Sequence, residues 1–244
     1  PRDVRLGRVG RTFAGRIACD TEVIASSSGG LTTWLLKQLL NRGLVHGVIH
    51  VAKAGTPGSG SHFKYVVSTR EDELSERRKS QYAPTQLADV LSQIRGDGRR
   101  YAVVGVPCFI KACRLLARQD AALAEQLTLF VGLVCGHLKS EFFGESLAWQ
   151  LGIPPTDLAS VDFRVKVPGR PSSSYDFGAL RTGEASWISL PTTSLVGGNW
   201  GHAAMQPEAC NFCDDIFAET ADVVFGDAWL PRFTPDWRGA NVVV

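Results

Sequence analysis

The first 150 residues alternate between short apolar runs and longer stretches in which apolar residues recur at helical spacing. The short runs are rich in β-branched residues and are bounded by Gly or polar residues, which is typical of buried strands. Strands that alternate with helices indicate an α/β domain with a largely parallel or mixed central sheet and flanking helices. The expected strands are 45–51, 63–68, 101–106 and 127–134, and the expected helices are 31–40, 68–78, 85–94, 110–118, 121–126 and 140–150.

Local signals predict where some of these elements begin and end. Gly43 follows the first helix and is expected to stop it. Ser68 and Glu71 have the order of a capping box and would begin the helix that runs to Arg78. The segment 55–60 is rich in Gly and predicts a loop of tight turns.

The pattern changes after Pro154. Short strands at 161–167, 174–181 and 185–190, separated by Gly, Pro and Ser, predict a small antiparallel β lobe. The remaining expected elements are a helix at 210–219 and strands at 221–226 and 241–244. We therefore expect two regions, 1–150 and 151–244, that form one composite domain. Because the chain opens on Pro without Met and stops in a strand-like run, we also expect both ends to be truncated.

Composition narrows the class of protein. With 244 residues, of which 44% are hydrophobic, the chain can bury one large core or two small ones. Its net charge of +2 gives no support to nucleic-acid binding, and no apolar stretch approaches the roughly 20 residues of a transmembrane helix. No signal peptide is visible, and six cysteines fit a reducing environment better than a disulfide scaffold, so we expect a cytoplasmic protein.

Four of the six cysteines lie in three short motifs that carry most of the candidate chemistry. Cys108 and Cys135 follow apolar runs that predict buried strands, and Cys210 and Cys213 form a Cys-x-x-Cys hook. Three chain segments could thus bring four thiolates to one point, as zinc or an iron–sulfur cluster requires. The alternative is that Cys108 and Cys135 are small core residues. The spacing of Cys210 and Cys213 favours a metal or redox site.

A loop of Ser and Gly residues, 26–30, leads into the first helix. Exposed N–H groups and hydroxyls at a helix N-terminus suit an anion such as the pyrophosphate of a cofactor. The alternative is an ordinary Ser cap, which the spacing alone favours. No Gly-x-Gly-x-x-Gly follows a strand, so a dinucleotide site of that type is not supported.

The other Cys and His residues are expected to be structural. Cys113 falls on the helix after Cys108 and should pack in the core, whereas Cys19 has no assigned role. His46 and His50 lie in a strand-like run.

Around its cysteines the chain resembles the family of beta subunits of coenzyme F-420-reducing hydrogenases and dehydrogenases. That family includes 7-hydroxymethyl chlorophyll a reductase and a divinyl chlorophyllide reductase. The resemblance runs over nearly the whole chain, and its motifs occur in the family's order. The segments that carry it are 27–33, 80–84, 105–111, 132–136, 210–214 and 221–229.

The resemblance implies an iron–sulfur flavoprotein with FAD and a 4Fe-4S cluster. Residues 1–150 would then bind the flavin, and 151–244 would complete the cluster site. By motif matching, the cluster ligands would be Cys108, Cys135, Cys210 and Cys213. The residues expected at the flavin, or tuning it, are Ser27, Ser28, Gly29, Gly30, Thr33, Ser80, Tyr82, His137 and Lys139. Arg164 and Lys166 are further tuning candidates, for which a solvated basic face is an equally good interpretation.

The implied function is that of an oxidoreductase that passes electrons between a one-electron carrier and a small two-electron acceptor. The carrier would be a ferredoxin or another iron–sulfur or hydrogenase subunit. Two alternatives stay open: an electron-transfer subunit with no substrate of its own, and a zinc-stabilised structural or binding module. The acceptor is open between a deazaflavin, a tetrapyrrole and other molecules, and catalytic residues and oligomeric state are not predicted.

Two residues depart from the family's motifs. Phe109 stands where the family has Gln, and Gln81 stands where it has Lys. Both positions are expected near the flavin or the substrate. Since the sequence contains one complete four-Cys set, a second cluster would come from a partner or from a segment outside this sequence.

Overall fold

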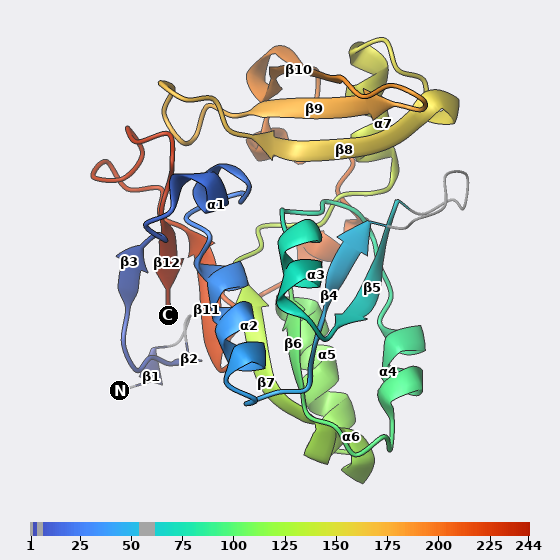
Figure 1. Cartoon of the computed structure of the whole chain (residues 1–244), viewed down its shortest axis with the longest axis vertical. Helices are drawn as coiled ribbons and strands as arrows, with labels where there is room; N and C mark the ends of the chain where they lie inside the picture. The colour runs from blue at the N-terminus through green and yellow to red at the C-terminus, as the bar shows by residue number, and fades with distance from the viewer. Residues whose placement is uncertain (1, 4–6, 54–61) are drawn as a thin grey trace.

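The computed structural model describes residues 2–3, 7–53 and 62–244, so the loop expected at 55–60 lies outside the described residues. Figure 1 shows a larger layered part below and a smaller sheet above it. The larger part is built on a seven-stranded sheet with the order β3-β12-β11-β7-β6-β4-β5. Its strands are β3 (Phe13–Gly15), β4 (Gly47–Lys53), β5 (Phe63–Ser68), β6 (Tyr101–Gly105), β7 (Leu127–Leu133), β11 (Val223–Asp227) and β12 (Asn241–Val243).

The centre of this sheet is parallel and its edges are antiparallel. β4, β6, β7 and β11 run parallel to one another, whereas β5 pairs antiparallel with β4, and β12 pairs antiparallel with both β11 and β3. All five residues of β6 are buried, as expected for a parallel strand covered on both faces. The predicted mixed α/β fold is therefore confirmed. A separate two-stranded ribbon joins β1 (Arg2–Asp3) and β2 (Gly7–Arg8).

Helices cover both faces of the central sheet. One apolar core joins the sheet to α2 (Leu31–Asn41) and α3 (Glu71–Glu76). A second core joins the opposite face to α4 (Ala88–Ile94), α5 (Pro107–Ala117) and α6 (Ala121–Gln126). The short helix α1 (Asp20–Ile24) precedes the Ser-Gly loop. Among the described residues, no helix combines the length and the apolar character needed to cross a membrane.

The smaller sheet forms the predicted antiparallel lobe. It contains β8 (Leu158–Val165), β9 (Asp176–Arg181) and β10 (Trp187–Pro191) in the order β10-β9-β8. Helix α7 (Phe142–Gln150) packs on it and contributes to its core. Phe63 and Ala83 of the larger part belong to the same core, so the lobe is packed against the α/β layers rather than tethered to them.

The lobe lies within a long excursion of the chain between β7 and β11. Short 3-10 turns occur within it at η1 (Pro155–Asp157), η2 (Thr192–Ser194), η3 (Trp200–His202) and η4 (Glu208–Phe212). After the excursion the chain re-enters the central sheet as β11, parallel to β7. The carboxyl ends of β6, β7 and β11 therefore share one edge of the sheet, where ligand sites of open α/β sheets form.

The first prediction of local structure that is wrong concerns residues 210–219. The helix expected at 210–219 is only the 3-10 turn η4, because the carbonyl of Ile216 accepts a hydrogen bond from the N–H of Cys135 (3.0 Å) instead of continuing a helix. Ala218 also has a left-handed backbone (φ 52°), which ends helical geometry.

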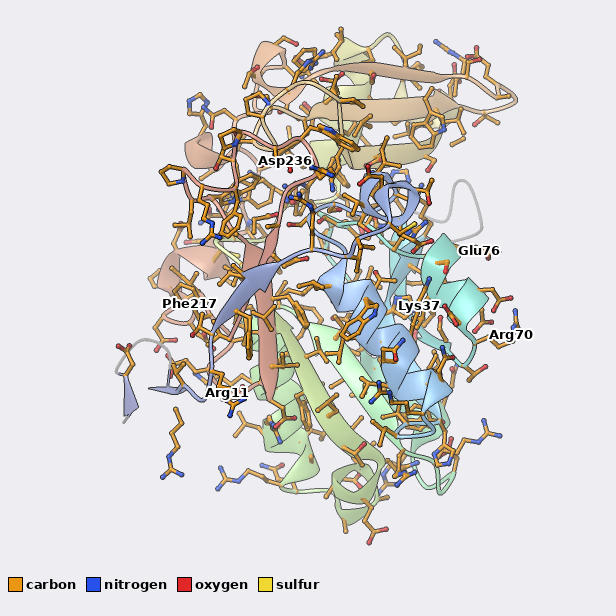
Figure 2. All side chains as sticks on the ribbon, turned by 60° about the vertical axis from the view of Figure 1, so that its left-hand side comes forward. Arg11, Lys37, Arg70, Glu76, Phe217 and Asp236 are labelled. Carbon is orange, nitrogen blue, oxygen red and sulfur yellow. The ribbon has the colours of Figure 1, made fainter. Side chains whose placement is uncertain are left out.

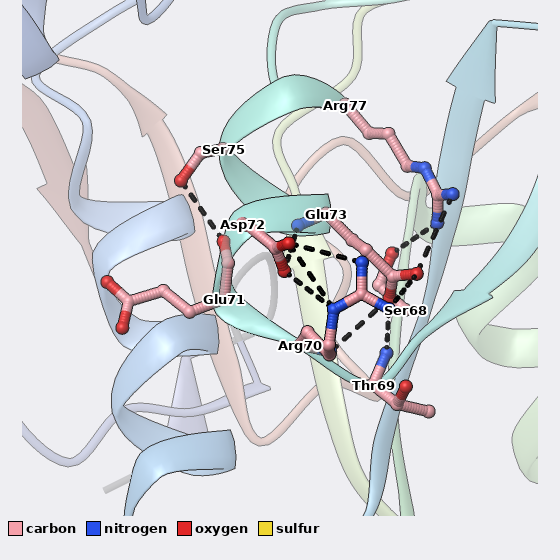
Figure 3. Close-up of polar contacts among 8 residues, drawn as sticks. All are labelled: Ser68, Thr69, Arg70, Glu71, Asp72, Glu73, Ser75 and Arg77. Atoms are coloured by element: carbon pink, nitrogen blue, oxygen red, sulfur yellow. Dashed lines mark hydrogen bonds and ion pairs between the residues drawn. The ribbon is translucent and has the colours of Figure 1, made fainter.

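The second error concerns the start of α3, which is shown in Figure 3. The carboxylate of Glu73, rather than that of Glu71, accepts hydrogen bonds from the N–H groups of Thr69 (2.8 Å) and Arg70 (3.3 Å). The hydroxyl of Ser68 accepts from Arg77 instead. The helix therefore begins at Glu71, two residues later than the predicted capping box implies.

Candidate functional site

The four cysteines of the three motifs lie at the carboxyl edge of the central sheet. Cys108 is in the first turn of α5, which begins at Pro107 directly after β6 and not at Ile110 as predicted. Cys135 follows β7, and Cys210 and Cys213 lie in or just after η4 at the far end of the excursion. The N–H of Leu138 donates to the sulfur of Cys210 (3.3 Å), which holds the two ends of the excursion together.

The four thiols share one electrostatic environment. Burial raises the pKa of Cys135 to about 12, and negative charge on Cys108, Cys210 and Cys213 acts in the same direction. Partial burial raises the pKa of Cys108, and negative charge on Cys213 and Cys210 raises it further. Hydrogen bonds from backbone N–H groups lower it, but by less. A cationic group among the thiols would reverse these shifts and favour thiolates. Within the described ranges, no three His, Cys, Asp or Glu side chains are grouped closely enough to hold a metal ion.

The two remaining cysteines lie elsewhere. Cys113 is 1% exposed within the core between α5 and the sheet, as predicted, and burial raises its pKa to about 11. Cys19 is exposed, and its sulfur lies 3.1 Å from the hydroxyl of Thr21.

The Ser-Gly loop before α2 uses its polar groups within the protein. The Ser27 hydroxyl accepts a hydrogen bond from the N–H of Ser80 (2.7 Å), and the Ser28 hydroxyl donates to the carbonyl of Ala240 (3.0 Å). The first N–H of α2, from Leu31, donates to the side-chain oxygen of Asn241 (3.0 Å). Thr33 lies half-buried in the first turn of the same helix. The loop is thus attached both to β12 and to the segment after α3.

The two glycines of this loop are required by the protein's own backbone. Gly30 has a left-handed conformation (φ 81°). A Cβ on Gly29 would lie 2.7 Å from the carbonyl oxygen of Gly15 and 2.9 Å from the nitrogen of Asn241. Packing against β3 and β12 therefore explains Gly29 without a cofactor.

Lys166 fixes the same loop from the other side. Its ammonium donates to the carbonyls of Val23 (2.9 Å), Ser28 (2.6 Å) and Arg238 (2.7 Å). Burial lowers its pKa to about 7, and the positive charge of Arg164 adds to the shift. Lys166 is thus a partly buried crosslink and not part of a solvated basic face.

Three of the residues expected near the flavin meet at Trp200. The ring of His137 stacks on that of Trp200 (4.5 Å between centroids, 15° between planes), and the ring of Tyr82 lies 4.4 Å away. The ammonium of Lys139 is 4.6 Å from the centre of the Trp200 ring and donates to the carbonyl of Ala204 (2.7 Å). Lys139 is fully buried. We call these four residues the Trp200 cluster.

Arg164 forms a second buried group beside Tyr82. Its guanidinium pairs with Asp227 at the end of β11 (2.6 Å) and lies over the rings of Tyr175 (4.6 Å) and Trp229 (5.2 Å). Burial alone would lower the pKa of Arg164. Asp227, Tyr82 and Tyr175 raise it and keep the guanidinium protonated. Since the residue is only 5% exposed, the solvated-face interpretation of Arg164 is wrong.

Two buried nitrogen atoms near these groups lack partners. Among the described residues, His137 Nε2 and Arg164 Nε are buried and have no hydrogen-bond partner. Buried polar atoms are nearly always satisfied in folded proteins, and those that are not point to a ligand or another special role. The two nitrogens therefore identify the surroundings of Tyr82 as a region with binding capacity that the protein itself does not use.

Sequence reasoning missed some of these residues. Trp200 lies in an irregular segment with no periodic signal, and its role depends entirely on tertiary packing. Asp227 belongs to a recognised motif, but only the structure brings it to Arg164. The departure at Phe109 is explained by packing, because its ring stacks on that of Tyr65 (5.6 Å) at the edge of the core between α5 and the sheet.

The mixed sheet, the inserted antiparallel lobe and the cysteine-lined edge define an α/β protein with a thiol-rich site at the carboxyl ends of its parallel strands. Two family models, both for the beta subunits of coenzyme F420 hydrogenase/dehydrogenase, match the chain. The model of their N-terminal part matches residues 12–92, and the model of their C-terminal part matches residues 98–244. The chain belongs to this family of coenzyme F420 hydrogenase/dehydrogenase beta subunits.

Two similar proteins come from species of Methanosarcina. The F subunit of the F(420)H(2) dehydrogenase of Methanosarcina mazei is 28% identical over 221 residues, which are 91% of this chain and 57% of that protein. The chain thus spans little more than half the length of this relative. A chain of the F420-reducing [NiFe] hydrogenase complex from Methanosarcina barkeri has the same fold, with a TM-score of 0.71 and 18% identity. That match covers all of this chain and 77% of the other.

Proposed function

We propose that the chain is an electron-transfer subunit of an oxidoreductase that binds FAD and a 4Fe-4S cluster. It passes electrons between a one-electron carrier and a small two-electron acceptor. The observation that carries the proposal is that four thiols from three segments lie at one sheet edge, within electrostatic reach of one another and close in the chain to the Trp200 cluster. Cys135 and His137 are two residues apart, so the same loop supplies both groups.

The cluster would be held by Cys108, Cys135, Cys210 and Cys213. The donor set fits in residue type, because four thiols from three segments are the ligands that such a cluster takes. The raised pKa values of Cys108 and Cys135 mean that positive charge among the thiols is needed to stabilise those two as thiolates. A bound 4Fe-4S cluster would supply one-electron transfer. The N–H of Leu138, which donates to the Cys210 sulfur, is the kind of hydrogen bond that tunes the potential of such a cluster.

FAD would be held between the first turn of α2 and the Trp200 cluster. Thr33, Ser80 and Tyr82 come from the two segments that the Ser27–Ser80 hydrogen bond joins. Bound FAD would supply hydride exchange with an organic molecule. The unpartnered Nε2 of His137 and Nε of Arg164 would provide hydrogen bonds to it, and the rings of Tyr82 and Trp200 would exclude water.

The family supports a proposal for the partner and for the acceptor. Its description and both relatives name coenzyme F420, so a deazaflavin is the acceptor we propose first. The electron partner would be another subunit of a hydrogenase or dehydrogenase, or a ferredoxin. An electron-transfer subunit without its own substrate would contain the same cofactors but fail to reduce an acceptor when purified alone.

The test is anaerobic purification with quantification of iron, sulfide and FAD. We expect Cys108→Ala, Cys135→Ala, Cys210→Ala and Cys213→Ala each to lose most of the iron, because binding of the cluster requires all four thiolates. Cys19→Ala and Cys113→Ala are the matched controls and should keep full iron. Full iron in Cys108→Ala would contradict the ligand set. A colourless protein with bound zinc and no FAD would establish the structural module instead.

A further inference from the structure

A cavity of about 260 Å³ lies between the segment that follows α3 and the small antiparallel sheet. The end of α3, marked by Glu76 in Figure 2, and the segment leading to Tyr82 form one wall. β4, β8 and β10 form the other. The lining residues are Ala25, Lys53, Ser75, Glu76, Arg78, Lys79, Ser80, Gln81, Val161, Asp162 and Trp187.

Lys79 holds the two walls together in a strained conformation. Its ammonium pairs with Asp162 (2.8 Å) and donates to the carbonyl of Arg164 (3.0 Å), both on β8. Its backbone φ of 95° lies in a region that L-residues rarely adopt. Such strain persists only where the surroundings enforce it, and it is concentrated at ligand sites. The cavity is therefore a built feature of the contact between the two sheets.

The rim of the cavity offers an aromatic face and a cation. Trp187 is 45% exposed although it lies beside the cavity. The ammonium of Lys53 is 5.2 Å from the centre of the Trp187 ring and donates to the Ser160 hydroxyl (2.6 Å). Arg78 and Lys79 have carboxylate partners. Among the described residues no carboxylate lies within ion-pair distance of the Lys53 ammonium, although the charge of Asp162 acts on it. An exposed indole beside an unpaired ammonium suits a flat ring that carries negative charge.

We infer that this cavity binds the ring of the two-electron acceptor, a planar conjugated heterocycle with an anionic group. Its volume is below the roughly 300–1,000 Å³ of pockets that enclose whole drug-sized ligands, so it holds one ring system and not a dinucleotide. It adjoins the proposed flavin site at Ser80, whose N–H is bonded to Ser27. The role as acceptor site rests on the proposed function, but the binding itself does not.

The inference also locates one departure from the family's motifs. Gln81, which stands where the family has Lys, lines this cavity. Because Gln81 is neutral and Arg78 and Lys79 already have carboxylate partners, Lys53 supplies the charge that recognises the anion.

The test is a fluorescence titration of the purified protein with its native cofactor content. The probes are coenzyme F420 and riboflavin 5′-phosphate, both anionic, and riboflavin, which is uncharged. The variants are Trp187→Leu and Lys53→Gln. The controls are Trp149→Leu on α7 and Lys111→Gln on α5, which are 64% and 54% exposed and do not line the cavity.

Trp187→Leu should weaken the binding of all three probes about tenfold, in line with ~1–3 kcal/mol for the stacking of a ring on an aromatic side chain. Lys53→Gln should weaken the two anionic probes by a similar factor and leave riboflavin unchanged. Unchanged dissociation constants in both variants, or equal losses in the controls, would overturn the site. A protein without FAD or iron that still shows these differences would refute the proposed function and keep the cavity.

Discussion

The Ser-Gly loop and the Trp200–Arg164 region both lie near the carboxyl edge of the sheet. They differ in whether their polar groups have hydrogen-bond partners within the protein. In the loop, Ser27, Ser28 and the first N–H of α2 all have partners within the protein. In the Trp200–Arg164 region, His137 Nε2 and Arg164 Nε are buried and unpartnered among the described residues. The loop had the sequence signal of an anion site, whereas Trp200 had none.

The difference teaches that a motif and a binding capacity need not coincide. A buried donor without a partner costs about 1–3 kcal/mol, which a ligand can recover. A donor that is already paired gains little from a ligand. The loop therefore shapes the site, and the binding energy is expected to come from the region around Tyr82.

The largest effect is expected from Arg164→Met, which removes the buried guanidinium from the Trp200–Arg164 region. It leaves Asp227 without its partner at a position where its side chain is 22% exposed. Removing one member of a buried ion pair typically costs ~3–5 kcal/mol, and the partial exposure of Asp227 places the loss near 3 kcal/mol. Urea unfolding at neutral pH measures it.

The double variant Arg164→Met/Asp227→Asn is the control for this experiment. It removes the stranded charge and should recover a large part of the lost stability. A loss below about 1 kcal/mol in the single variant would mean that the pair is effectively exposed.

A somewhat smaller effect is expected from Gly29→Ala, which tests the satisfied loop. The added Cβ meets backbone atoms of Gly15 and Asn241 and the Cβ of Arg16, none of which is the far end of a flexible side chain. Overpacking typically costs ~1–3 kcal/mol, and contacts with backbone atoms place this variant near the upper end. Gly10→Ala is the matched control, because a Cβ there has no heavy atom within 4 Å. Thermal melting should separate the two, and equal melting temperatures would show that the loop is not tightly packed.

Much of the fold could be predicted because its signals are local. The buried strands β6 and β7 are nearly continuous apolar runs, and their positions were predicted within one residue. The helix at 210–219 failed because the carbonyl of Ile216 is taken by Cys135, about 80 residues away in the chain. A hydrogen bond between such distant segments leaves no periodic trace in the sequence.

The site was predictable to the extent that its chemistry depends on residue type and spacing. The sequence indicated one site of four thiols, from the Cys-x-x-Cys hook and from the strand-end positions of Cys108 and Cys135. The structure places these thiols within electrostatic reach of one another. The Arg164–Asp227 pair could not be predicted, because β8 and β11 meet only through the packing of the lobe on the central sheet.

The smallest effect is expected from His50. Its comparison with His137 contrasts a ring nitrogen that has a partner with one that has none. Among the described residues His137 Nε2 has no partner, whereas His50 Nε2 lies 2.8 Å from the Ser68 hydroxyl. Because that hydroxyl also accepts from Arg77, it donates its own hydrogen to a neutral His50.

Burial and the charge of Arg77 lower the pKa of His50 from 6.5 to about 4. The unfolded chain therefore takes up this proton first, and stability falls as the pH drops from 6.5 toward 4. Between pH 7.5 and 5.5 this one group should remove about 1 kcal/mol of unfolding free energy. His50→Gln keeps an acceptor for Ser68 but does not titrate, so its urea midpoint should change less over the same interval. An identical pH dependence in His50→Gln and the unmodified protein would mean that His50 is not held neutral by its surroundings.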